Sequence, residues 1–286
     1  MLRVDRQVTV RCGDRVLDLS SPVVMGIINV TPDSFYPASR VGDSVGQAID
    51  LAAQMISEGA QILDVGGMSS RPGAEEIPEE VEIERVIPVI RAIHHQFPNV
   101  MVSVDTYRSG VADAGIKEGV VMINDISGGL LDPEILPLVA RHQLPYVLMH
   151  MRGTPKDMQL HTDYEDIITE LLKYFIARVS VARQAGIRDV ILDPGFGFSK
   201  TLAQNYQVIH KLGMLRILSC PILIGVSRKS TLSKTILRPI EESLEATTAL
   251  HMAALLNGAN ILRVHDVRPA MDAIAVFEQL QRAENP

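Results

Sequence analysis

The chain has 286 residues, enough to bury a large core, and its 47% apolar and 21% charged residues are typical of a globular protein. A net charge of -7 argues against a nucleic-acid-binding protein, which normally carries a basic face. Only Cys12 and Cys220 occur, so we expect a reducing compartment and no structural metal cluster.

The amino terminus carries charges throughout and lacks the apolar core of a signal peptide. No run in the chain approaches the ~20 apolar residues that cross a bilayer. We therefore expect a cytoplasmic protein that binds neither membranes nor nucleic acid. The alternation in "RQVTVRCGDRVLDL" predicts a β-hairpin that turns near Gly13 and Asp14 and closes the bottom of the following fold.

Short apolar runs recur after this hairpin, and each ends on polar residues. The runs are "VVMGIINV", "QILDVGG", "VMVSVDT", "VVMINDIS", "YVLMHM", "VILDPG", "ILIGVSRK" and "ILRVHD". Runs that are apolar on both faces indicate buried parallel strands. Amphipathic segments such as "SVGQAIDLAAQMISEGA" and "YEDIITELLKYFIARVSVARQAG" separate them, and glycines at 59, 119, 186 and 258 mark helix ends.

This alternation of strands and helices gives about eight units, which is the number that closes a (β/α)₈ TIM barrel. A doubly wound open sheet is the alternative, but residues 26–34 hold no G-x-G-x-x-G turn. No linker divides the chain. We predict an α/β fold with an N-terminal hairpin extension (residues 1–22) packed on a single barrel domain (residues 23–286).

In a barrel, the polar residues at the strand ends converge on one mouth. They are Asn29, Asp105, Asn124, Asp193, Lys229, Arg263 and His265. A strand end often becomes polar as it leaves the core, but acids, amides and bases together favour a ligand with a polar edge and an anionic part. Asp193 and Asn124 suit a guanidine-like edge, although Asp193 alone is equally compatible with a turn cap.

Arg263 and His265 alternate with Val264 and form a reasonable anion site, although a salt bridge from Arg263 to an acid of a neighbouring strand is a common alternative. Lys229 is either a ligand contact or a solvated lysine. Two long connections, residues 31–44 and 68–78, suggest functional loops, and Arg71 in the second is either an anion clamp or a solvated arginine. No dense carboxylate cluster surrounds Asn29, so a Mg²⁺ ion held by substrate phosphates and one protein oxygen is the metal site that remains open.

Taken together, these motifs resemble the dihydropteroate synthase family. "MGIINVTPDSF" and "DVGGMSSRPGA" are similar to its two signature loops, and "SVDT", "INDIS", "LMHMRGTP", "LDPGFGF", "GVSRKS" and "RVHDV" follow in the family's order from about Val23 to Val267. The resemblance implies a transferase that joins 6-hydroxymethyl-7,8-dihydropterin diphosphate to p-aminobenzoate in folate biosynthesis. It also implies Mg²⁺ and a homodimer.

The resemblance also implies roles for individual residues. Pterin contacts fall on Asp105, Asn124, Met149, Asp193 and Lys229; diphosphate contacts on Asn29 (through Mg²⁺), Ser70, Arg71, Arg263 and His265; aminobenzoate contacts on Pro32, Phe35, Ser70, Arg71, Phe198, Ser227 and Lys229. The catalytic group comprises Asp105, Lys229, Arg263 and His265.

The chain departs from the family pattern at residues 36–40 and at Met68, where an acid is common, and these positions affect the aminobenzoate side. Two alternatives are a non-catalytic pterin-binding homologue and a methyltetrahydrofolate-binding methyltransferase domain. Arg71, Asp105 and the Arg263–His265 pair favour the synthase. In "VILDPGFGFSK", Phe198 is expected to wall the aminobenzoate site and Phe196 to pack beneath the loop.

Overall fold

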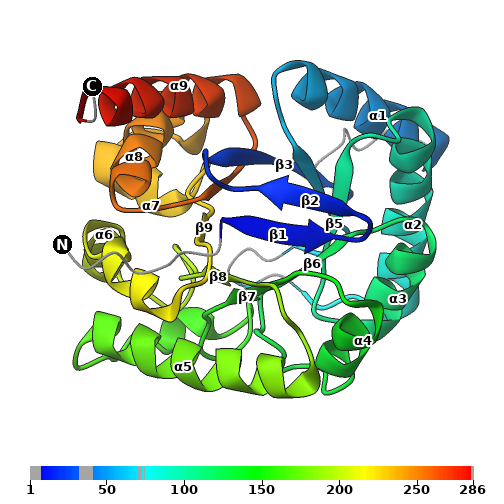
Figure 1. Ribbon diagram of the computed structural model, residues 1–286, viewed down its shortest axis with the longest axis horizontal. Helices are drawn as coiled ribbons and strands as arrows, with labels where there is room; N and C mark the ends of the chain where they lie inside the picture. Colours follow the sequence, from blue (N-terminus) through cyan, green and yellow to red (C-terminus); the bar gives the residue numbers. More distant parts are fainter. Residues whose placement is uncertain (1–7, 32–40, 70–72, 74, 285–286) are drawn as a thin grey trace.

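The computed structural model describes residues 8–31, 41–69, 73 and 75–284. Its centre is an 8-stranded parallel sheet in the order β8-β7-β6-β5-β4-β3-β10-β9 (Figure 1). The strands are β3 (Val23–Asn29), β4 (Ile62–Gly66), β5 (Met101–Asp105), β6 (Met122–Asp125), β7 (Tyr146–Met149), β8 (Val190–Asp193), β9 (Leu223–Ile224) and β10 (Ile261–Val264). A parallel bridge between Leu192 and Ile222 joins β8 to β9 and closes the barrel.

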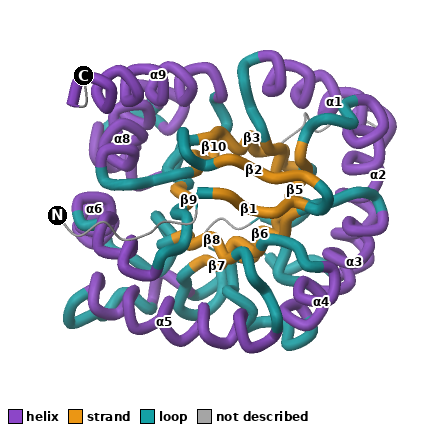
Figure 2. Tube along the Cα trace, in the orientation of Figure 1, coloured by secondary structure: helices purple, strands orange, loops and turns teal. Residues whose placement is uncertain are grey.

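Helices surround the barrel and cover its outer face (Figure 2). They are α1 (Val41–Ser57), α2 (Glu79–Gln96), α3 (Ser109–Lys117), α4 (Ile135–His142), α5 (Ile167–Ala185), α6 (Leu202–His210), α7 (Ser230–Ile236), α8 (Leu244–Leu256) and α9 (Val267–Glu284). Three 3₁₀ segments, η1 (Met158–Leu160), η2 (Leu212–Leu218) and η3 (Ile240–Glu242), lie in the connections. This arrangement confirms the predicted (β/α)₈ barrel.

Local chemistry sets where these helices begin and end. Oδ1 of Asp166 accepts a hydrogen bond of 2.7 Å from the amide of Thr169 and caps the start of α5. The same helix ends at Gly186, whose φ of 107° lies in the left-handed region that glycine adopts without a Cβ penalty. The other three glycines predicted to end helices also have positive φ values.

The amino-terminal end of the barrel is closed by apolar side chains. The predicted hairpin is present as β1 (Thr9–Cys12) and β2 (Arg15–Asp18), paired antiparallel. Its Val10, Cys12 and Leu17 pack with residues from the starts of the barrel strands, such as Ile62 and Ile261. The hairpin therefore lies across the bottom of the barrel (Figure 1). The division into residues 1–22 and 23–286 stays a prediction.

The strands end at the opposite, carboxyl-terminal mouth, where the polar residues lie. One expected strand differs: "ILIGVSRK" was predicted as a strand up to Lys229, but β9 ends at Ile224. Arg228 has a φ of 48°, which is incompatible with a β-strand, and Lys229 instead precedes helix α7. None of the helices in the described part of the chain is long and apolar enough to span a membrane.

Candidate active site

An ion-pair cluster occupies the mouth of the barrel. The guanidinium of Arg263, from β10, donates through Nε to Oδ2 of Asp64 in β4 and through Nη2 to Oδ2 of Asp105 in β5, both at 2.6 Å. Because β3 separates β10 from β4 in the sheet, these bonds cross the barrel interior rather than follow one edge. We call Arg263, Asp64, Asp105 and Asn124 the Arg263 cluster.

The members of this cluster are shielded from water. The side chain of Asp64 is 0% exposed, and those of Asp105 and Arg263 are 16% and 18% exposed. Burial raises the pKa of Asp105 to about 7, Arg263 opposes the rise, and Asp64 adds to it. Burial acts to lower the pKa of Arg263, but the two carboxylates outweigh it, so the guanidinium stays charged.

Asn124, at the end of β6, is oriented by the same carboxylate. Its Nδ2 donates to Oδ2 of Asp64 at 2.8 Å, so its amide oxygen faces away from Asp64. Asp64 has no role among the predicted site residues. A charged residue inside the apolar run "QILDVGG" was the available signal, because an acid in a buried strand needs a partner.

Asp193 ends β8 and is 7% exposed. Its Oδ1 accepts a hydrogen bond of 2.7 Å from the amide of Gly195, so the turn-cap interpretation is realised. Burial raises the pKa of Asp193, and the ammonium of Lys229 opposes this rise. The capped carboxylate keeps Oδ2 as an acceptor and lies near a cation, so capping and ligand binding are compatible.

Lys229 lies over the loop that follows Asp193. Its Nζ donates to the carbonyl oxygen of Phe196 and lies 4.7 Å from the ring centroid of Phe198. Burial lowers the pKa of Lys229 to about 8, and the charge of Asp193 opposes the fall. Phe196 is fully buried, as expected, and its ring lies nearly perpendicular to that of Tyr206, with 6.4 Å between the centroids.

An apolar wall lines the same region. Met149, at the end of β7, and Phe198 are 3% and 8% exposed and pack in one cluster with Ile126 and Tyr107. Met68 packs against this cluster and is half-buried. The wall therefore brings together the residue predicted to line the pterin slot and the residue predicted to line the aminobenzoate site.

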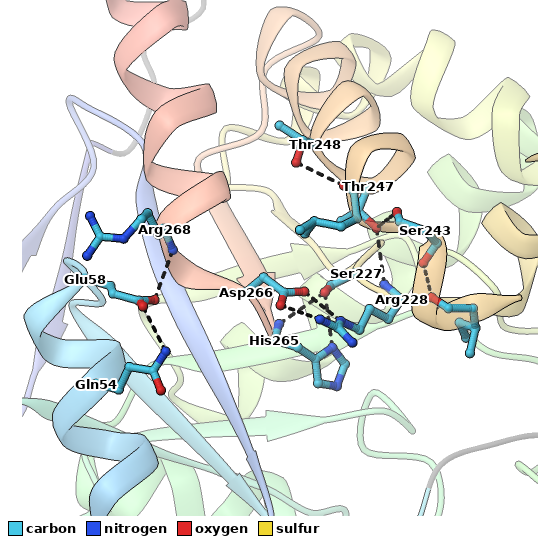
Figure 3. A network of polar contacts seen from close by, with 12 residues as sticks. Gln54, Glu58, Ser227, Arg228, Ser243, Thr247, Thr248, His265, Asp266 and Arg268 are labelled. Carbon is cyan, nitrogen blue, oxygen red and sulfur yellow. Dashed lines mark hydrogen bonds and ion pairs between the residues drawn. The ribbon is translucent and has the colours of Figure 1, made fainter.

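Ser227 and His265 lie together on the other side of the mouth (Figure 3). Oγ of Ser227 accepts a bond of 3.1 Å from the backbone amide of His265 and lies 3.1 Å from Nδ1 of that ring. Ser227 thus contacts a residue predicted to bind diphosphate, although Ser227 itself was predicted to bind aminobenzoate. Next to them, Asp266 accepts two bonds from Arg228, at 2.6 and 2.7 Å, and serves as its ion-pair partner.

Asn29 is the last residue of β3 and is half-buried, and its Cα pairs with Gly66, which pairs with Asp105. It therefore lies at the mouth and can present one hard amide oxygen. Among the residues that the structure describes, no group of three or more His, Cys, Asp or Glu side chains is arranged to hold a metal ion. Asn29 can contribute one oxygen to a Mg²⁺ ion that a ligand's phosphates also hold.

The remaining predicted contacts, Pro32, Phe35, Ser70 and Arg71, lie outside the described residues. The other predicted contact residues lie at the carboxyl-terminal mouth of the barrel. Carboxylates and an amide lie there together with cations and the apolar wall. Such an arrangement can bind a flat heterocycle by its polar edge, hold an anion beside it and stabilise charge that develops between them.

Comparisons with known proteins agree with this geometry. A family model described as pterin binding enzyme matches residues 25–265. The dihydropteroate synthase of Synechocystis sp. is 43% identical over 262 residues, which cover 91% of this chain and 90% of that protein. The Xanthomonas albilineans dihydropteroate synthase with 4-aminobenzoic acid has a TM-score of 0.89 at 38% identity, covering 96% of this chain and 98% of that one. The Yersinia pestis dihydropteroate synthase with a sulfonamide drug complex has a TM-score of 0.90 at 39% identity, covering 96% and 99%.

The buried ion pair generates a stability prediction. Asp64→Asn removes an anion that faces Arg263 inside the barrel, so we expect it to lower the free energy of unfolding by about 3 kcal/mol. The matched control is Asp266→Asn, which breaks an arginine–aspartate pair of similar length whose arginine is 40% exposed; its cost should be about 1 kcal/mol or less. Urea unfolding measures both, and equal losses would contradict the importance of burial.

Proposed function

The chain belongs to the dihydropteroate synthase family of pterin-binding enzymes, and from this premise we propose which residues of its barrel mouth bind each part of the substrates. As a member of the family it is a transferase of folate biosynthesis. It joins 6-hydroxymethyl-7,8-dihydropterin diphosphate to p-aminobenzoate and releases 7,8-dihydropteroate and pyrophosphate. The observation that supports the assignment is the meeting of the Arg263 cluster, Asp193 and the apolar wall at one mouth.

The pterin ring binds through its amino-pyrimidinone edge. The carboxylate of Asp193 accepts the two donors of that edge. Asn124 supplies its amide oxygen, because its Nδ2 is directed to Asp64. Met149 lines the slot for the ring, Lys229 lies near Asp193, and Asp105 lies near the ring.

The diphosphate binds on the cationic side of the mouth. Arg263 and His265 hold its oxygens, and the carboxylates that contact Arg263 fix the position of the guanidinium before the substrate arrives. Asn29 would help the diphosphate to hold a Mg²⁺ ion, which would supply additional positive charge for the leaving group. Ser70 and Arg71 stay predicted contacts to the same group.

The aminobenzoate site lies beyond the pterin. Phe198 forms its apolar wall, and Ser227 and Lys229 supply polar contacts at its edge. Pro32, Phe35, Ser70 and Arg71 stay predicted contacts from the two long loops. A ring-binding wall next to a pterin slot places the amine close to the pterin methylene, which favours attack by proximity alone.

We propose an SN1-like path for the transfer. The bond between the pterin methylene carbon and the diphosphate oxygen breaks first, and its electron pair leaves with pyrophosphate. Asp105 stabilises the pterin-methyl cation, and the carboxylate remains close because Arg263 holds its Oδ2. The amine lone pair then forms the carbon–nitrogen bond, and the nitrogen loses its proton to water or pyrophosphate.

We also propose that the chain forms a homodimer. Helix α8 presents Leu256 to solvent with 55% exposure, and Leu237, which follows α7, is 88% exposed. Met214 and Ile217 of η2 are exposed as well. Large apolar side chains exposed over neighbouring elements support an interface between two copies on this side of the barrel.

The reaction assay tests the proposed function. Purified protein incubated with the dihydropterin diphosphate, p-aminobenzoate and Mg²⁺ should form 7,8-dihydropteroate, detected by mass, and omission of Mg²⁺ should lower the rate. Asp193→Asn should lower kcat/KM at least about tenfold, because it removes the charge that accepts the pterin donors. Pterin binding without any product would instead indicate a non-catalytic homologue.

We predict that titration of Lys229 causes activity to fall at alkaline pH. Since burial lowers its pKa to about 8, the ammonium loses its proton as the pH rises through that value, and kcat/KM for the pterin substrate should fall there. In Lys229→Arg the cation persists, so the residual activity should not fall with rising pH up to about pH 10. A pH–rate profile of each protein measures this loss of activity. The same alkaline fall in both proteins would exclude Lys229 as its origin.

Substituted anilines test the order of bond changes. If the carbon–oxygen bond breaks before the amine attacks, kcat should change little across amines of different nucleophilicity. Single-turnover rates measured at saturating amine give the comparison. A rate that follows amine nucleophilicity throughout the series would rule out the SN1-like path.

A further inference from the structure

A lysine with no role in the assignments above is buried beneath the loop that connects β8 to α6. Lys200 is 3% exposed, and its Nζ donates to the carbonyl oxygens of Gly195 and Phe198 at 3.0 Å each. A third contact of 3.1 Å joins Nζ to Nδ1 of His150, which follows β7. The ammonium has three donors, and each therefore faces an acceptor.

The acceptors of Lys200 carry no negative charge, so its burial is unfavourable on its own. Burial lowers the pKa of Lys200 to about 7, and Asp193 opposes the fall. Burial also lowers the pKa of His150, and the charge of Lys200 lowers it further. A neutral His150 presents the lone pair of Nδ1 to the ammonium and carries its proton on Nε2. Because the partners of this buried cation are neutral, ion pairing does not explain why Lys200 is buried, and another function is suggested.

The residues that accept from Lys200 belong to the active site. Gly195 accepts from Lys200 with its carbonyl oxygen and donates its amide to Oδ1 of Asp193 at 2.7 Å. Phe198 accepts with its carbonyl oxygen, and its ring lies beside Lys229. Lys200 thus holds the backbone of the two residues that set the pterin carboxylate and the aminobenzoate wall.

The conformation of this loop explains why it needs internal donors. Gly195, Gly197 and Ser199 have φ values of 68°, 88° and 42°, so the chain turns tightly and directs carbonyl groups inward. A Cβ at Gly195 would clash with the carbonyl oxygen of His150, which shows how closely the loop packs on β7. Lys200 satisfies two of the loop carbonyls from beneath, and Lys229 satisfies that of Phe196 from the mouth.

Other bonds fix the ends of the loop. Oδ1 of Asn205, in α6, accepts the amide of Gly197 at 2.6 Å. Oγ of Ser199 accepts the amide of Arg152 at 3.0 Å and contacts the hydroxyl of Tyr164. These groups hold the amide of residue 197 and the side chain of residue 199. The carbonyl oxygen of Gly195 accepts from the amide of Phe198 at 3.1 Å as well as from Lys200, and the carbonyl oxygen of Phe198 accepts from Lys200.

We propose that Lys200 is a positioning residue of the transfer reaction: without touching substrate, its ammonium holds the β8–α6 loop in the shape that directs Asp193 at the pterin and Phe198 at the aminobenzoate. This proposal rests on the proposed function, because it takes the pterin and aminobenzoate roles of Asp193 and Phe198 from it. The alternative is that Lys200 contributes only to the stability of the fold.

Lys200→Met separates these two roles, because methionine retains the apolar stem and removes the ammonium. Calorimetry with 6-hydroxymethylpterin should show binding weakened about tenfold, since two carbonyls next to the pterin carboxylate and wall lose a charged donor. Steady-state kinetics should show higher KM values for both substrates. Binding of inorganic pyrophosphate should change by less than about twofold, because Arg263 and His265 are held by Asp64, Asp105 and Ser227 and not by this loop.

Two controls remove the effect of lost stability. Ile93→Ala in α2 creates a cavity in the outer core, far from the β8–α6 loop, and should lower the free energy of unfolding without weakening pterin binding. The second control is the pair His150→Asn and His150→Leu, which have similar volumes and differ in the acceptor presented to Lys200. We expect pterin binding about fivefold weaker in the leucine variant than in the asparagine variant.

The outcomes are distinct. Weakened pterin binding with retained pyrophosphate binding in Lys200→Met, together with a difference between the two His150 variants, supports the proposal. Equal weakening of pterin and pyrophosphate binding, or His150 variants that behave alike, overturns it and leaves a structural lysine. If wild-type protein binds the pterin and Asp193→Asn does not, but Lys200→Met binds normally, only the role of Lys200 fails. If the wild-type protein fails to bind the pterin, the proposed function fails with it.

Discussion

Burial of charge inside the barrel is the constraint on which the mouth depends. An isolated carboxylate or guanidinium removed from water costs several kcal/mol, so each buried ion requires partners at hydrogen-bond distance. Asp64 meets this requirement through Oδ2, which accepts from both Arg263 and Asn124, whereas its buried Oδ1 has no hydrogen-bond partner among the described residues. Arg263 meets it by donating to both Asp64 and Asp105. One fully buried carboxylate thereby sets the direction of an amide and the position of a cation. The apolar hairpin closes the opposite end of the barrel, which confines the polar groups to the mouth.

The proposed residue roles account for transfer of the pterinylmethyl group without a strong base. The groups that stabilise charge are in place before the substrate binds, so little reorganisation accompanies bond breaking. In the proposed mechanism, cations stabilise the leaving diphosphate, and the carboxylate of Asp105 stabilises the positive charge that remains on the pterin. The β8–α6 loop completes the site from the other side, where Lys200 and Lys229 contact its backbone from opposite faces. The capped Asp193 and Phe198 consequently belong to one hydrogen-bonded loop.

Much of this architecture could be predicted from the sequence, because buried parallel strands and hairpins leave clear apolar patterns. The barrel, the hairpin and the convergence of Asn124, Asp193 and Arg263 follow from those patterns. The roles of Asp64 and Lys200 could not be predicted in this way. An acid or a lysine beside apolar residues gives the same sequence pattern whether its charge is solvated or paired across the barrel. The turn that contains Arg228, with its positive φ, was also missed, because neighbouring residues do not reveal it. The contact between His150 and Lys200 could not be predicted, because the two residues lie 50 apart in the sequence.

The most direct test of the account is a double-mutant cycle between Asp64 and Arg263, measured as free energies of unfolding in urea. Asp64→Asn and Arg263→Met each leave a buried charge with fewer partners, whereas the double variant removes both members of the pair. If mutual compensation holds the mouth together, the double variant should lose about 1–3 kcal/mol less stability than the sum of the single variants. Losses that add within about 0.5 kcal/mol would contradict it, because the two side chains would then contribute independently.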